Sequence, residues 1–227
     1  MSSNHETGLI KRTQLFSRLT SEELSEIYSK LSIKRFKKNE VILHEEDTNK
    51  YMYIILKGRV KVVQTTEEGR EIVLSIHESG DTFGEISLID GMTSVARVMA
   101  ATNSLVATIS REDFNFLLFS HDKILQNLLH MLCARLRENV ETIRMLNLSN
   151  AAQRIHMLFI KLAHDYGTKA EDGILLSIKL THNEIANMTG LTRETVTRIM
   201  KKWQQEGHIR MKERKVFLKK EFLDTIK

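Results

Sequence analysis

The stretch from Leu180 to Ile209, LTHNEIANMTGLTRETVTRIMKKWQQEGHI, constrains the fold more than any other part of the chain. Thr181 has the position of an N-terminal cap for a short helix, and Thr192 has that of a cap for a second helix. Between the two, Gly190 can adopt the left-handed backbone conformation that a tight corner requires. Two helices joined by a short glycine-containing turn are typical of the helix-turn-helix motif. The alternative interpretation is an ordinary helical hairpin with a solvated charged face.

The second predicted helix has an apolar face and a polar face. Its apolar residues recur at helical spacing and are Val196, Ile199, Met200 and Trp203. The polar side chains off that face are Arg193, Thr197, Arg198, Lys201 and Lys202. Glu194 lies in the first turn, where the helix dipole stabilises an acidic side chain. Arginine and glutamate at the start of such a helix are typical of one that enters the major groove of DNA.

The basic residues of the chain are concentrated at its C-terminal end. The whole chain has 34 Lys or Arg against 29 Asp or Glu, a net charge of +5. Residues 181–227 contain eleven Lys or Arg and six Asp or Glu, a surplus of five, so the preceding residues are balanced. Because phosphate groups attract such a local surplus, the distribution favours double-stranded DNA as a partner.

The sequence predicts neither a membrane span nor a secretion signal. No apolar run is long enough to cross a bilayer, and the first residues are polar. Cys133 is the single cysteine, so no disulfide forms within the chain and a reducing compartment is favoured. We therefore expect a cytoplasmic protein without a membrane partner.

The N-terminal half changes from a helical to a β pattern near Phe36. Before this residue, apolar side chains repeat at helical spacing from Leu15 to Leu31. After it, short β-rich runs occupy residues 41–43, 51–56, 60–63, 72–76 and 105–109. Charged or glycine-containing turns separate these runs. Many short strands at such spacing predict an antiparallel β-roll or jelly roll.

A long helical segment is expected from about Arg111 to Leu148. Residues spaced alternately four and three apart form a stripe along it: Leu125, Leu129, Leu132, Leu136, Asn139, Ile143 and Leu146. A lone helix packed on its own sheet could carry the same stripe. The continuity of the seam and the asparagine within it favour a dimeric coiled coil. A two-fold dimer suits a protein that reads palindromic DNA.

These patterns divide an α+β chain into three successive parts. The parts are an N-terminal effector-type β-roll at residues 1–110, a dimerisation helix at 111–148 and a DNA-binding domain at 149–227. Within the last part, Ile155, Leu158, Phe159 and Leu162 form the apolar face of a helix. Expected strands at 173–179 and 216–218 flank the two helices of the motif. The C-terminal domain is therefore predicted to be a winged helix-turn-helix.

This order of parts resembles the CRP/FNR family of bacterial transcription regulators over nearly the whole chain. Two motifs carry the resemblance. FGEISLIDG at residues 83–91 is similar to the start of the family's phosphate-binding cassette, and TRETVTR at residues 192–198 is similar to its recognition helix. The resemblance implies a homodimeric regulator in which a signal, or the dimer packing itself, sets the angle between two winged helices. RNA polymerase is an implied partner if the protein is an activator.

In family members that read a TGTGA half-site, the two arginines and the glutamate of the second motif contact bases. Carried over to this chain, these roles fall on Arg193, Glu194 and Arg198. The chemistry agrees with these roles, since arginine can donate two hydrogen bonds to guanine and glutamate can accept one from the amino group of cytosine. Thr192 and Lys201 are expected to contact phosphates, which position the helix without reading sequence. The full expected DNA-binding set is Thr192, Arg193, Glu194, Thr197, Arg198 and Lys201.

The effector site departs from the family pattern. Cyclic-nucleotide-binding members carry an arginine for the cyclic phosphate and then a small residue, where this chain has Ser94 and Val95. The missing charge-assisted hydrogen bond is worth about 1.5–3 kcal/mol. These members also have two residues on the long helix that contact the base of the nucleotide. At those two positions this chain has Asn139 and Val140. The candidate effector residues are Gly84, Glu85, Ser94, Val95 and Asn139. We expect a sensor domain that does not use cyclic AMP, and a cyclic-nucleotide-dependent activator is the alternative.

A structural explanation of residues 83–91 stands beside the ligand-binding one. Gly84 and Gly91 would supply backbone geometry for a turn, and Ile86, Leu88 and Ile89 would lie in the core.

Other ligand chemistries lack a complete set of residues. An iron–sulfur cluster needs about four cysteines, and Cys133 is alone. His77 is a single candidate haem ligand, and His130 with Cys133 is only a pair, so no cofactor or metal is assigned. For Cys133, a thiol switch and a small buried side chain are the two interpretations.

No enzyme motif is present: the chain has no phosphate-binding loop with a lysine, no HExxH and no GxSxG. A nucleotide-binding module that regulates a partner protein is the alternative from another class. Such modules lack a basic helix-turn-helix, so Arg193 and Arg198 favour a sequence-specific DNA-binding regulator.

Overall fold

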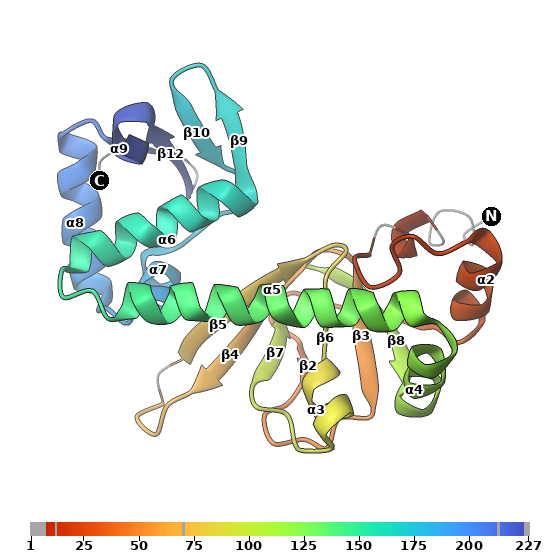
Figure 1. The fold of residues 1–227 in the computed structure, drawn as a ribbon. Coiled ribbons are helices and arrows are strands. Elements are labelled where there is room, and N and C mark those ends of the chain that lie inside the picture. Colours follow the sequence, from red (N-terminus) through yellow and green to blue (C-terminus); the bar gives the residue numbers. More distant parts are fainter. Residues whose placement is uncertain (1–7, 12, 70, 213, 225–227) are drawn as a thin grey trace. The chain divides into compact units, whose positions relative to one another are not determined.

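The computed structural model describes residues 8–11, 13–69, 71–212 and 214–224, and its chain divides into two compact units (Figure 1). The units are Met1–Arg137 and Glu138–Lys227. Antiparallel sheets and helices occur in both units, which confirms the predicted α+β class.

The first unit contains two four-stranded antiparallel sheets. One has the strand order β1-β8-β3-β6 and the other β2-β7-β4-β5. The strands are β1 (Ser32–Phe36), β2 (Val41–Leu43), β3 (Tyr51–Lys57), β4 (Arg59–Thr65), β5 (Glu71–Glu78), β6 (Thr82–Phe83), β7 (Arg97–Ala100) and β8 (Ser104–Ser110). This arrangement confirms the predicted antiparallel β-roll. The strands β1, β6 and β7 escaped the sequence prediction because they are short or carry charged residues.

Strand β3 is buried on both faces, which explains its uninterrupted apolar sequence. Met52, Ile54 and Leu56 belong to a core shared with helices of this unit. Tyr53 and Ile55 point the other way, into the core between the two sheets. Alternation along one strand therefore joins both cores of the unit.

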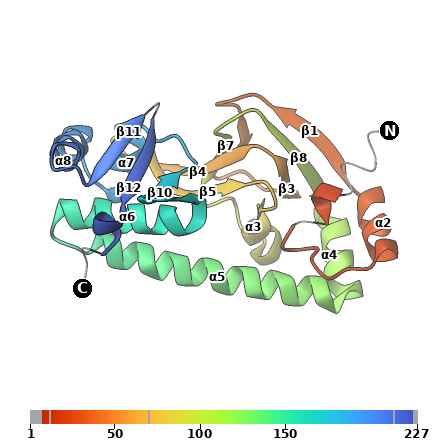
Figure 2. The same ribbon diagram turned by 90° about the horizontal axis from the view of Figure 1, so that it is seen from above.

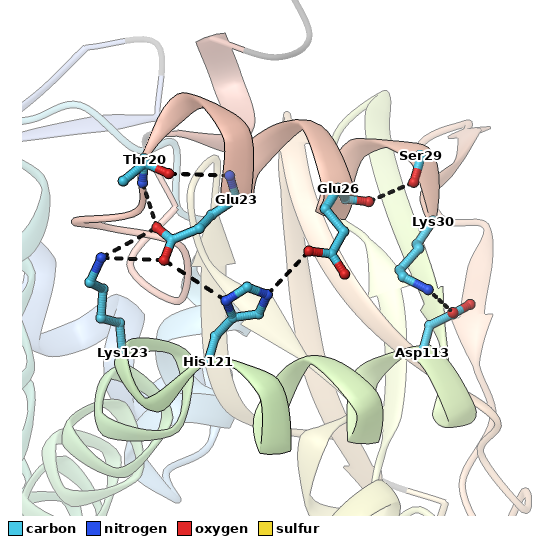
Figure 3. Close-up of polar contacts among 8 residues, drawn as sticks. All are labelled: Thr20, Glu23, Glu26, Ser29, Lys30, Asp113, His121 and Lys123. Atoms are coloured by element: carbon cyan, nitrogen blue, oxygen red, sulfur yellow. Dashed lines mark hydrogen bonds and ion pairs between the residues drawn. The ribbon is translucent and has the colours of Figure 1, made fainter.

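Helices α2 (Ser21–Ser29), α4 (Arg111–Ser120) and the start of α5 (Asp122–Leu146) pack on the first of these cores. The expected single helix from Arg111 to Leu148 is wrong, because the helix is interrupted at His121, which has an extended backbone. Polar contacts with α2 surround this break (Figure 3). Nδ1 of His121 lies 3.9 Å from a carboxylate oxygen of Glu23, and Nε2 lies 3.5 Å from one of Glu26.

The N-terminus of α2 is closed by a capping box. The backbone N–H of Glu23 donates to the Thr20 hydroxyl, and the Thr20 N–H donates to the Glu23 carboxylate. That hydrogen bond from the Thr20 backbone is the main cause that lowers the pKa of Glu23, and Lys123 adds to it. At the other end of α2, Nζ of Lys30 lies 2.8 Å from Oδ1 of Asp113 on α4 (Figure 3). The two ends of α2 are thus tied to the two helices that flank the break.

Helix α5 carries two apolar stripes on different sides. Ile124, Leu128 and Met131 are buried in the core of the first unit. Most of the predicted seam is exposed in the single chain: Leu125, Leu129, Leu136, Asn139, Ile143 and Leu146. Leu132 differs, since it packs partly against the core. The seam therefore lacks a partner within the described part of the chain, as a dimer interface requires.

The second unit is a winged helix, as predicted. Its elements are the end of α5, α6 (Ala151–Tyr166), β9 (Gly167–Ala170), β10 (Gly173–Leu176), α7 (His182–Thr189), α8 (Arg193–Gln205), β11 (Ile209–Lys212), β12 (Lys215–Lys219) and α9 (Lys220–Asp224). The antiparallel sheet has the order β11-β12-β10-β9. One core joins these elements, with Ile155, Phe159, Val196 and Met200 fully buried in it. The strand β9 was missed because GTKA has little β character.

The segment 83–91 differs in part from the structural expectation. Gly84 and Gly91 do have left-handed backbones, with φ of 86° and 75°. The two glycines flank a short helix, α3 (Glu85–Asp90), rather than a simple turn. Leu88 is buried, but Ile86 and Ile89 are 47% and 52% exposed, so their expected core position is wrong. So short a helix can place only one of its faces against the core.

The contact between Lys30 and Asp113 generates a prediction about acid stability. Lys30, followed by a hydrogen bond from Ser110, lowers the pKa of Asp113 below its ordinary 3.8. The stabilisation is therefore complete above this value and is lost as pH falls through the lower pKa of the folded state. We expect Asp113→Asn to flatten the fall in unfolding free energy between about pH 5 and pH 3, measured by urea denaturation. Lys30→Met should flatten it similarly, and slopes that match the original protein would contradict this.

Candidate DNA interface and effector site

Local capping residues determine where the two helices of the helix-turn-helix begin and where the first of them ends. At Thr181, a capping box with Glu184 opens α7. Gly190 closes α7 in a left-handed conformation with φ of 64°. The Thr192 hydroxyl then accepts from the backbone N–H of Thr195 and opens α8. These caps satisfy N–H groups that would otherwise lack partners, so they fix where both helices begin.

Helix α8 separates its buried and exposed residues by helical periodicity. Val196 and Met200 are fully buried, and Ile199 and Trp203 pack partly against the same core. The residues expected to contact DNA are all exposed: Thr192, Arg193, Glu194, Thr197, Arg198 and Lys201. The helix therefore brings this set together along one exposed side and at its cap.

A hollow of about 470 Å³ lies beside the start of α8. It is lined by Leu180, Thr181, His182, Asn183, Arg193, Met211 and Arg214, which belong to α7 and the segment before it, to α8 and to the β11–β12 wing. Figure 2 labels these helices and strands within the second unit. The backbone N–H of Leu180 donates to the Arg214 carbonyl at 3.0 Å and ties the wing turn to this segment. The hollow therefore lies between the helix-turn-helix and its wing.

His182 is a residue of this region that sequence reasoning missed. Nδ1 of its ring lies 2.8 Å from the hydroxyl oxygen of Thr197 on α8. Burial lowers the pKa of His182, and the positive charge of Arg193 lowers it further. Its position at the start of α7 is readable in the sequence, but its contact depends on how α7 and α8 cross.

At the candidate effector site, Gly84 is required for packing. A Cβ at this residue would lie 2.8 Å from Nδ2 of Asn49 and 2.9 Å from the Tyr51 carbonyl oxygen. Nδ2 of Asn49 donates to the carbonyls of both Gly84 and Tyr51. Asn49 is 2% exposed, so this amide is a buried support for the start of α3.

The Glu85 carboxylate is buried and paired within the unit. Its Oε1 accepts a hydrogen bond from Arg135 of α5, whose guanidinium also donates to the Thr82 carbonyl. Oε2 of Glu85 is buried without a hydrogen-bond partner among the described residues. Sequence reasoning missed Arg135 because it followed the outer seam of α5. The inner stripe through Leu128 and Met131 continues to Arg135 at helical spacing, and this signal could have found it.

The remaining candidate effector residues do not supply a phosphate site. Ser94 is 9% exposed, and its hydroxyl donates to the Ala96 carbonyl at 2.8 Å. Val95 is 60% exposed. Arg97, the arginine nearest to Ser94 and Val95 in the sequence, is not a candidate either, because its guanidinium donates to the Glu71 carboxylate at 2.6 Å. Asn139 is exposed on the part of α5 that belongs to the second unit.

Neither a metal-binding cluster nor a membrane-spanning helix occurs in the part of the chain that the structure describes. The described residues contain no group of three or more His, Cys, Asp or Glu side chains that could hold a metal ion. In these ranges no helix has both the length and the apolar content needed to cross a membrane. Cys133 is exposed, so the expectation of a buried side chain is wrong for the single chain.

Each of the two units matches a different protein-family model. Residues 33–121 match the cyclic nucleotide-binding domain, and residues 153–222 match the Crp-like helix-turn-helix domain. Together these two matches cover most of the chain.

Individual relatives match across both units. The cAMP-activated global transcriptional regulator CRP of Salmonella typhimurium is 31% identical over 192 residues, covering 84% of this chain and 90% of the relative. The cyclic AMP receptor protein of Thermus thermophilus is 27% identical over 202 residues, with 89% and 90% covered. Among solved structures, a CooA mutant from Carboxydothermus hydrogenoformans has a TM-score of 0.76 at 24% identity, covering 92% of this chain and 95% of its own.

The buried Glu85–Arg135 pair generates a stability prediction. Arg135→Met leaves the Glu85 carboxylate buried without its counter-charge, which should cost about 3–5 kcal/mol of unfolding free energy. The double variant Glu85→Gln with Arg135→Met should recover most of this loss, since no buried charge remains. Arg137→Met removes an exposed arginine from the same helix and should change stability little. Chemical denaturation measures all three, and equal losses in the single and double variants would contradict the account.

Proposed function

The chain belongs to the CRP/FNR family of transcription regulators, and we propose that its homodimer reads a TGTGA-type palindrome through α8. One observation carries the proposal: Arg193, Glu194 and Arg198 are exposed together at the start of a helix whose other side is buried. The family match over residues 153–222 supports the same role for this helix.

The side chains of α8 divide by chemistry into base-reading and phosphate-binding groups. Arg193 and Arg198 each present a planar fork that can donate two hydrogen bonds to guanine O6 and N7. Glu194 is four residues before Arg198, so both lie on the same side of the helix, and it can accept from a cytosine amino group. Thr192 and Lys201 hold backbone phosphates, which orient the helix in the major groove.

The exposed seam of α5 supports the homodimer. Leu129, Leu136 and Ile143 are 53%, 65% and 59% exposed in the single chain. Such a regular apolar stripe is buried when it pairs with a second copy in a coiled coil. Two-fold pairing presents two recognition helices to half-sites about one turn of DNA apart. A DNA-binding dimer of this kind acts where the chromosome is, in the cytoplasm, and contacts RNA polymerase if it activates transcription.

We propose that the sensor domain of this chain does not use cyclic AMP. Several relatives are named as cAMP-activated, but the positions that would neutralise a cyclic phosphate here are Ser94 and Val95. The Ser94 hydroxyl already bonds to the Ala96 carbonyl, and Val95 carries no polar group. The second candidate, a cyclic-nucleotide-dependent activator, is favoured by one observation. Oε2 of Glu85 is buried without a hydrogen-bond partner among the described residues, and it could accept a hydrogen bond from a ribose hydroxyl.

The test is the affinity of the purified protein for a palindrome of TGTGA and TCACA half-sites against a scrambled duplex. Both are titrated at fixed salt without nucleotide, with cyclic AMP and with cyclic GMP. Selective binding to the palindrome that neither nucleotide changes supports the proposal in full. Selectivity only with a cyclic nucleotide would support the second candidate. Equal affinity for both duplexes under all conditions would contradict the assigned base contacts.

Substitutions in α8 should separate base reading from phosphate binding. Arg198→Ala should cost about 1–3 kcal/mol of binding to the palindrome and relax the preference at one base pair. Lys201→Ala should weaken the palindrome and the scrambled duplex alike and reduce the dependence on salt. Equal losses on both duplexes for Arg198→Ala would assign that arginine to phosphate instead.

Substitution in the seam should separate the protomers. Leu136→Glu places a charge in the centre of the proposed coiled coil, so sedimentation should detect monomers and the palindrome should bind weakly. Arg144→Glu changes a side chain that is 72% exposed and off the seam, and should leave the dimer intact. A dimer that persists in Leu136→Glu would contradict the proposed interface.

A further inference from the structure

The hollow between α7, α8 and the wing has the lining of an anion site. Its charged or titratable groups are His182, Arg193 and Arg214, and no carboxylate side chain is among the described residues that line it. On the same helix as His182, Glu184 directs its carboxylate to the backbone and hydroxyl of Thr181. The hollow therefore offers positive charge without an internal counter-ion.

The hydrogen bonds of Thr197 determine which nitrogen of His182 remains available. The Thr197 hydroxyl donates its one hydrogen to the backbone carbonyl of Arg193 at 2.8 Å. The contact of 2.8 Å between this hydroxyl and the His182 ring must then use a hydrogen on Nδ1 of the imidazole. Nε2 has no hydrogen-bond partner within the described part of the chain.

The protonation state of Nε2 decides what this nitrogen can bind. In the neutral ring, with the hydrogen on Nδ1, Nε2 carries a lone pair and can only accept a hydrogen bond. Phosphodiester oxygens only accept, so the neutral ring cannot bind them through Nε2. In the protonated ring, Nε2 carries an N–H and the imidazole is a cation, which suits a phosphate oxygen.

The surroundings of His182 favour the neutral ring in the free protein. Burial disfavours the charged form, and Arg193 of α8 adds like-charge repulsion, so the pKa is lowered. Arg214, from the wing, adds a second cation to the lining of the hollow. A phosphate anion in the hollow reverses the balance, because it neutralises the arginines and attracts the protonated imidazole.

We propose that His182 is a proton-linked DNA contact, which binds a backbone phosphate of the target through protonated Nε2, so that DNA binding takes up one proton. The proposal rests on the proposed function, since the phosphate belongs to the DNA that α8 reads. It adds a regulatory property to that site: occupancy of the DNA depends on pH through a residue that reads no base.

The direction of the effect follows from linkage. Because the bound form holds one more proton than the free form, DNA affinity rises as pH falls between the pKa of the complex and the lower pKa of the free protein. Uptake of a single proton limits the rise to about tenfold per pH unit. A phosphate contact is independent of sequence, so the palindrome and the scrambled duplex share the same pH dependence.

The experiment measures affinity for both duplexes between about pH 6 and pH 8 at fixed salt, for the original protein and three variants. His182→Gln keeps a hydrogen-bonding side chain but cannot titrate, so its affinity should be flat with pH and equal to the high-pH value. His182→Arg is always charged, so its affinity should also be flat but near the low-pH value. His208→Gln changes another histidine of the same unit, outside the lining of the hollow, and should keep the original pH dependence.

A second measurement counts the protons directly, in the original protein and in His182→Gln. Calorimetric titration of the original protein with DNA, in two buffers of different ionisation enthalpy, counts the protons taken up on binding. Uptake in the original protein that His182→Gln abolishes supports the proposal. Absence of uptake, or an equal pH dependence in His182→Gln, overturns it. Loss of selectivity for the palindrome with the proton uptake retained would instead contradict the proposed function and leave the phosphate contact standing.

Discussion

The functional surface of the second unit depends on the burial of Val196 and Met200, the two side chains that fix α8 in its core. Because a helix repeats about every 3.6 residues, burying this edge turns Arg193, Thr197 and Arg198 outward. The cap at Thr192 sets where the helix begins and hence which residues occupy its first, exposed turn. An apolar core interaction thereby determines which polar groups are exposed for the proposed contacts with DNA.

In the first unit, a buried ion pair has a comparable role. Arg135 of α5 holds the Glu85 carboxylate at the start of α3, and the next residue, Leu136, belongs to the exposed seam. One helix thus carries the partner of a candidate effector residue on one side and the dimer stripe on the other. Any ligand that changes the pairing of Glu85 would act directly on the helix that carries the proposed dimer seam. This gives a physical route for regulation that does not require cyclic AMP.

Sequence reasoning succeeded where local signals and periodicity decide the structure. The caps at Thr181 and Thr192 and the corner at Gly190 depend on residues close in the chain, so they were predictable. It failed where distant contacts decide, as at His121, where packing against α2 surrounds the interruption of the predicted helix. The exposed position of Ile89 and the pairing of Glu85 with Arg135 also depend on tertiary packing. The hydrophobic character of its residues does not by itself determine which side of a short helix is buried.

The central claim is that two copies of this chain, joined along α5, place two α8 helices in successive major grooves. Varying the distance between the TGTGA and TCACA half-sites tests it most directly. The account predicts highest affinity when the half-site centres are about one helical turn apart, and a steep loss when they are about half a turn closer or further. Affinity that is the same for every spacing would mean that each winged helix binds alone, and would contradict the account.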